Sequence, residues 1–189
     1  SLVGSEMCIR DRSNSMKTSI VTLLITFCFY LSVYAQAPQD KATELKEQAL
    51  SSLKQKDYIK ARYLFKKAYE AFAVRENYPQ AIECGIQANA LYVRGNFYKE
   101  GFELCRNMEQ LIWTGEQKQN KVFYDLRFPI SKERLQMYIS LKNPAQAKNQ
   151  LDKLEEIASL AKNDSLMEVL LYTKANYYYT FNQNTQGDA

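Results

Sequence analysis

The 189-residue chain carries 25 lysines and arginines against 21 aspartates and glutamates, a formal net charge of +4 at pH 7, and contains no histidine. It therefore lacks the commonest general base and the usual imidazole metal ligand. The small positive charge, with no basic block, does not favour nucleic-acid binding. Only six glycines and four prolines interrupt the sequence, which is typical of a helical protein.

The N-terminal segment is predicted to lie outside the folded domain. Residues 1–15 are interpreted as non-native, because their first twelve letters (SLVGSEMCIRDR) are similar to a conceptual translation of a sequencing-library adapter. Residues 16–35 then form a signal peptide, with a lysine, an apolar run and a cleavage site ending at Ala35. The protein is expected to be exported, to the periplasm or another extracytoplasmic space. An uncleaved membrane anchor is the alternative.

Apolar residues recur at helical spacing through the rest of the chain, and turn residues separate the runs. The sequence shows no convincing pair of strands. The predicted helices cover residues 41–55, 58–74, 79–94, 98–113, 121–141, 145–162 and 165–181.

Capping residues set the predicted helix starts. Pro79 and Pro144 suit the first turn of a helix, because the N–H that proline lacks has no partner there. Asn143 precedes Pro144 as a cap, and Asn163 or Asp164 is expected to cap the last helix.

Two predicted interruptions concern the middle of the chain. Thr114-Gly115 is interpreted as a helix C-terminus, followed by a polar loop over residues 116–120. Pro129 predicts a break or kink near Phe128, because proline inside a helix costs about 3 kcal/mol.

A pattern of small and apolar residues recurs at i, i+4 and i+7, at intervals of forty-odd residues. Recurrence at such intervals indicates stacked helical hairpins. The three copies are Ala61, Phe65 and Ala68, then Gly101, Cys105 and Met108, then Ala147, Leu151 and Leu154.

These paired helices resemble tetratricopeptide repeats, in which small residues let the two helices of a hairpin approach closely. The first unit carries the resemblance best, through Leu45, Ala49, Tyr58, Ala61, Phe65 and Ala68. The spacings from Ala61 to Gly101 (40) and from Gly101 to Ala147 (46) exceed the usual period of about 34 residues, so longer helices or loops are required. The resemblance implies an all-α, tetratricopeptide-like solenoid over residues 36–189, with an incomplete last repeat at its C-terminus.

The signal segment, the long repeat units and the sequence ANYYYTF at residues 175–181 resemble the extracytoplasmic sensor portion of Bacteroidetes-type histidine kinases or related membrane regulators. The resemblance implies a non-catalytic protein-binding arm, attached to the membrane by its signal segment or by a transmembrane helix encoded downstream. Any kinase domain would follow Ala189. The alternative is a stand-alone secreted or periplasmic adaptor that scaffolds an envelope complex.

In such solenoids the first helices of the hairpins line a peptide-binding groove. The positions of this chain that correspond to the groove positions of such repeats are Lys46, Leu50, Lys54, Ile86, Ala90, Arg94, Lys132, Gln136, Tyr172, Asn176 and Tyr179. The four basic residues among them predict a protein or peptide partner that is acidic or presents a C-terminal carboxylate. The alternative interpretation is a solvated helix face with ordinary lysines.

Cys84 and Cys105 fall on the two helices of one predicted hairpin. They are a candidate disulfide if their Cα atoms lie within about 7 Å. The alternative is that both are buried as small apolar residues. The sequence suggests no catalytic residue, metal site or cofactor in this segment.

Overall fold

The structure, a computed structural model, describes residues 40–181, so the predicted adapter and signal segments lie outside the described residues. Within this range the chain forms helices and no strands, and none of these helices is long and apolar enough to cross a membrane. The helices are α2 (Lys41–Lys54), α3 (Tyr58–Val74), α4 (Tyr78–Arg94), α5 (Tyr98–Gln119), α6 (Tyr124–Ser140), α7 (Pro144–Ala161) and α8 (Asp164–Thr180).

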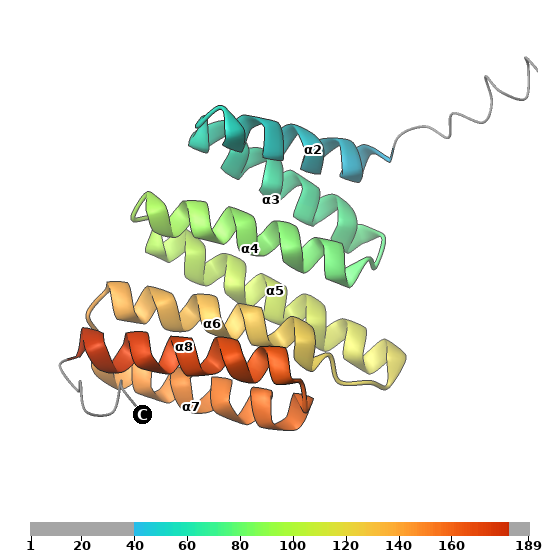
Figure 1. The fold of residues 1–189 in the computed structure, drawn as a ribbon. Coiled ribbons are helices and arrows are strands. Elements are labelled where there is room, and N and C mark those ends of the chain that lie inside the picture. The colour runs from blue at the N-terminus through green and yellow to red at the C-terminus, as the bar shows by residue number, and fades with distance from the viewer. Residues whose placement is uncertain (1–39, 182–189) are drawn as a thin grey trace, which may run out of the picture. The chain divides into compact units, whose positions relative to one another are not determined.

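The helices pair into antiparallel hairpins that stack side by side, which confirms the predicted all-α helical-hairpin solenoid. α2 pairs with α3, α4 with α5, and α6 with α7. In Figure 1, α2, α4 and α6 lie in front of α3 and α5, and α8 lies in front of α7. α8 packs against both α6 and α7.

The same backbone turn follows α2, α3, α4 and α6. After α6, for example, Lys142 N–H donates to the Ile139 carbonyl and Asn143 N–H to the Tyr138 carbonyl, each at 3.0 Å. This is the Schellman arrangement, which satisfies the last carbonyls of a helix and needs one left-handed residue. The left-handed residues are Lys56 (φ 62°), Glu76 (φ 57°), Asn96 (φ 62°) and Lys142 (φ 53°), none of them glycine.

The residue after each of these left-handed positions is the N-cap of the next helix. At three of these caps the side chain accepts a hydrogen bond from the backbone N–H three residues on, as is usual for an N-cap: Asp57, Asn77 and Asn143. Asn163 caps α8 by accepting from Ser165 N–H. The caps predicted at Asn143 and Asn163 are therefore confirmed.

The recurring small and apolar positions are the inner faces of α3, α5 and α7. All nine residues of the three copies are buried, and eight of them are fully inaccessible to solvent. The recurring pattern therefore marks the buried face by which the second helix of each hairpin packs against its neighbours.

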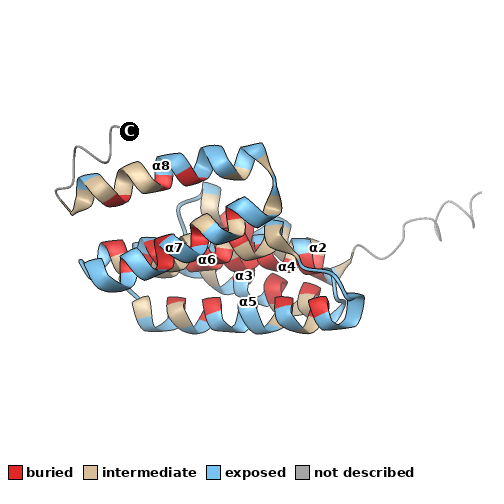
Figure 2. Cartoon of the chain, turned by 90° about the horizontal axis from the view of Figure 1, so that it is seen from below, coloured by how far each residue is buried: buried red, intermediate tan, exposed pale blue. Residues whose placement is uncertain are grey.

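α6 contributes to two hydrophobic cores. Ile130 and Met137 belong to the core formed with α2–α5. Phe128, Leu135 and Ile139 belong to a second core with α7 and α8. Figure 2 shows the buried positions where helices face one another and exposed positions along the outer side of α5.

The predicted end of the fourth helix at Thr114-Gly115 is wrong, because α5 continues to Gln119. Gly115 is a packing glycine: a Cβ atom there would lie 2.7 Å from Cζ of the buried Tyr78 ring. The left-handed residue that ends the helix is Asn120 (φ 49°). The expected loop over residues 116–120 is therefore mostly helical.

The expected break near Phe128 is also wrong, because α6 runs from Tyr124 to Ser140 with Pro129 inside it. The hydrogen bond that Pro129 cannot donate would reach the carbonyl of Asp125 in the first turn, at an exposed residue. Phe128 and Ile130, on either side of the proline, are both buried and hold the segment in the helix.

Gly115→Ala should lower the free energy of unfolding by about 1–3 kcal/mol, because the new methyl group has no room against Tyr78. Chemical denaturation monitored by circular dichroism measures the change, with the exposed Gln117→Ala on the same helix as a control. A gain in stability of about 1 kcal/mol, as expected when alanine replaces an exposed glycine in a helix, would contradict this packing.

Lys142→Gly should raise the free energy of unfolding by about 0.5–1 kcal/mol. Glycine relieves the left-handed strain at φ 53°. The free energy gained in this way exceeds the free-energy cost of the larger conformational entropy that glycine gives the unfolded chain. Lys142→Ala, which keeps a Cβ atom, should leave the same denaturation midpoint unchanged. Equal effects of glycine and alanine would show that the turn is not left-handed.

Candidate functional site

The predicted groove residues all lie on α2, α4, α6 and α8, the first helices of the hairpins. Leu50, Lys54, Ala90, Arg94, Gln136, Tyr172 and Tyr179 are exposed. The half-buried members are Lys46, Ile86, Lys132 and Asn176. Ile86 packs against the first core, so it serves the fold as well as the surface.

Two of the four cations in this predicted groove already have partners within the protein. Lys46 Nζ lies 2.7 Å from Glu83 Oε2 and donates to Gln80 Oε1 at 2.8 Å, which ties α2 to α4. The Arg94 guanidinium lies 4.1 Å from the centre of the Tyr58 ring, a cation–π distance. Lys54 and Lys132 make no ion pair within the described residues and carry the remaining positive charge of this surface.

Cys84 and Cys105 are free thiols in this structure, and both are fully buried. Burial raises the pKa of Cys84 to about 11 and that of Cys105 to about 12. The charges near Cys84 come from Lys46 and Glu83, whereas those near Cys105 include Arg134 on α6. The two cysteines are unbonded and buried in this structure, and a disulfide between them outside the cytoplasm stays a prediction.

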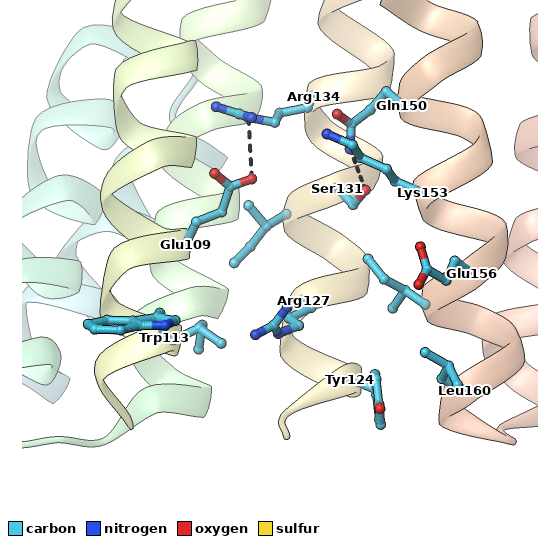
Figure 3. Close-up of a pocket in the computed structure, with 13 residues that line it drawn as sticks. Glu109, Trp113, Tyr124, Arg127, Ser131, Arg134, Gln150, Lys153, Glu156 and Leu160 are labelled. Carbon is cyan, nitrogen blue, oxygen red and sulfur yellow. Dashed lines mark hydrogen bonds and ion pairs between the residues drawn. The ribbon is translucent and has the colours of Figure 1, made fainter. Parts of the chain in front are cut away.

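A cavity of about 460 Å³ lies on a different part of the surface, where α5, α6 and α7 meet (Figure 3). None of the predicted groove residues lines it. Its volume is within the range of small-molecule sites. The lining residues are Glu109, Ile112 and Trp113 from α5, Tyr124, Arg127, Ile130, Ser131 and Arg134 from α6, and Gln150, Lys153, Glu156, Ile157 and Leu160 from α7.

The cavity has a polar end and an apolar end. Figure 3 shows Arg134, Lys153, Ser131 and Gln150 together at one end, and Trp113, Tyr124 and Leu160 around the other. Gln150 donates a hydrogen bond to the Ser131 hydroxyl, and both side chains are almost completely buried. Trp113 and Leu160 remain 54% and 51% exposed, so the apolar end of the cavity is open to solvent.

Arg134 is incompletely paired. Its Nε atom is buried without a hydrogen-bond partner and lies 3.4 Å from Glu109 Oε1. Lys153 and Glu156 form no ion pair among residues 40–181. A buried guanidinium nitrogen that lacks a hydrogen bond is costly, and a bound acceptor would remove that cost.

Glu116 holds Arg127 at the edge of the cavity. Its Oε1 atom accepts from Arg127 Nε at 2.7 Å and from Phe123 N–H at 2.8 Å, and its Oε2 atom pairs with the same guanidinium. Burial alone would raise the pKa of this carboxyl, but the hydrogen bonds from Arg127 and Phe123 outweigh it and lower the pKa. The contact fixes the end of α5 against the start of α6.

Sequence reasoning identified none of the cavity residues. The available signals were the single tryptophan of the chain and the seven-residue spacing of Arg127 and Arg134 on one helix face. The expected helix end at Gly115 hid the first signal, and the expected break near Phe128, which lies between the two arginines, hid the second.

The described residues bring together no group of three or more side chains suited to hold a metal ion. Comparisons with protein-family models, curated proteins and solved structures found no match to this chain.

Glu116→Gln should lower the free energy of unfolding at pH 7 by about 1–3 kcal/mol, because a buried charge-assisted contact is lost. The native pKa of Glu116 is depressed, so its contribution is present above the pKa of the unfolded state and is lost as pH falls through the native pKa. The stability difference between wild type and variant should thus shrink in acid. The exposed Glu103→Gln on the same helix is the control, and a pH-independent difference would contradict this role.

Proposed function

We propose that this chain is a non-catalytic, tetratricopeptide-like binding module that recognises a protein or peptide, as the extracytoplasmic sensing arm of a signal-transduction protein. The observation that supports it most strongly is the stacking of hairpins whose first helices, α2, α4 and α6, lie on the same side of the solenoid, with α8 in front of α7 (Figure 1). Extended surfaces of this kind are what stacked hairpins use for binding.

The charge that remains on this side indicates the kind of partner. Lys54 and Lys132 extend from α2 and α6 without ion pairs among the described residues, while Lys46 and Arg94 are engaged in internal contacts. An acidic segment would meet both lysines, and exposed Leu50 and Tyr179 offer apolar contacts beside them. The proposed partner is therefore an acidic peptide segment.

The proposal is tested with an array of synthetic acidic peptides and with the double variant Lys54→Glu/Lys132→Glu. Reversal of both charges should weaken the bound peptides by about tenfold or more. Lys60→Glu/Lys99→Glu, with the same charge change on exposed residues of α3 and α5, should leave binding nearly unchanged. Equal losses for both double variants, or the absence of any bound peptide, would contradict the proposal.

A stand-alone adaptor of the cell envelope is the second candidate, because the same surface would serve a scaffold. The sequence of the surrounding gene distinguishes the two. A membrane-spanning segment followed by a kinase or DNA-binding domain favours the sensor, and a stop codon within one or two further repeats favours the adaptor.

A further inference from the structure

The cavity between α5, α6 and α7 has the charge layout of a site for a ligand with two charged ends. Arg134 and Lys153 lie at the polar end, where the Ser131 hydroxyl accepts a hydrogen bond from Gln150 and keeps its own proton available to donate. A carboxylate bound at this end would find donors in Lys153, the Ser131 hydroxyl and Arg134 Nε. The buried Nε atom of Arg134, which has no hydrogen-bond partner, is the group that gains most from such an occupant.

The opposite charge lies one helical turn away on the same wall. Glu156 is three residues after Lys153 on α7, which separates them by about 4.5 Å along the helix axis. Figure 3 shows its carboxylate directed toward the cavity, below the position of Lys153. The two charged ends of the ligand would therefore lie about one helical turn apart, a separation that a peptide of two or three residues can span.

The total charge of the lining argues against a simple anion as the occupant. Arg127 is paired with Glu116 and Arg134 lies beside Glu109, so Lys153 and Glu156 are left as one charge of each sign. A ligand that carries both charges matches this layout better than a ligand with only one.

The apolar end specifies the body of the ligand. Trp113 from α5 and Leu160 from α7 stand on opposite sides of the opening and are both about half exposed. Ile112 and Ile130 form a fully buried base. A bulky aliphatic or aromatic side chain packed against Trp113 would cover apolar surface that is now in contact with water.

We propose that this cavity binds a short peptide with free ends, of two or three residues, whose carboxylate meets Arg134 and Lys153, whose amino group meets Glu156, and whose apolar side chain packs against Trp113. This inference extends the proposed role in peptide recognition to a second site, on residues that the surface of α2, α4, α6 and α8 does not share.

Trp113 is the only tryptophan of the chain, so its fluorescence reports on this cavity directly. The full chain is titrated with the dipeptide Leu-Leu, its N-acetyl form, its C-terminal amide, and octanoate. Leu-Leu should shift the Trp113 emission to shorter wavelength and bind about tenfold more tightly than either blocked form. Octanoate tests whether a free carboxylate on an apolar chain is sufficient, and affinity equal to that of Leu-Leu would overturn the role of Glu156.

Two variants of exposed residues separate the two charged ends without disturbing the core. Lys153→Gln should weaken Leu-Leu about tenfold and reduce the preference over the amide, part of which Arg134 retains. Glu156→Gln should abolish the preference over the N-acetyl form. Lys148→Gln, on the same helix but outside the cavity, should bind like wild type. No fluorescence change with any ligand, or unchanged affinity in both cavity variants, would overturn the proposal.

The outcome is separable from the test of the acidic-peptide surface. Lys54 and Lys132 do not line the cavity, so their charge reversal should leave the Leu-Leu titration unchanged. Loss of one binding activity with retention of the other identifies which of the two proposals fails.

Discussion

The fold depends on the burial of two sides of a single helix. α6 places Ile130 and Met137 in the core with α2–α5, and Leu135 and Ile139 in the core with α7 and α8. A helix that is apolar on more than one face must be covered on more than one side. α6 therefore joins the first two hairpins to the third, and the polar contact from Asn89 Nδ2 to Glu133 Oε2 (3.1 Å) sets its position against α4.

The same helix forms the floor of the cavity. Because α6 packs against both α5 and α7, its remaining side faces the space between them, and that side carries Arg127, Ser131 and Arg134. The long α5 brings Trp113 to one wall, and Glu116 in its last turn contacts Arg127 and fixes the start of α6. The cavity is thus a consequence of how three helices pack, while the surface of α2, α4, α6 and α8 is a consequence of the repeat itself.

Local features of the sequence predicted the helices well, because periodicity and caps act within a few residues. The stripe Ala61, Phe65 and Ala68 is buried as expected, and Asn143 and Asn163 cap the helices that they precede. The errors occur where residues that are distant in the sequence determine the local structure. Gly115 is helical because the Tyr78 ring lies against it, and Pro129 stays in α6 because its neighbours are buried in two cores. The cavity was missed for the same reason, since its residues come from three helices whose relative placement no local pattern specifies.

Amide hydrogen exchange measured by mass spectrometry on Met137→Ala tests the central claim most directly, because this substitution opens a void only in the core with α2–α5. If α6 couples the two cores, exchange should accelerate in α7 as well as in α4 and α5. Faster exchange confined to α4 and α5, with α7 unchanged, would show that the two cores are independent and that α6 does not join them.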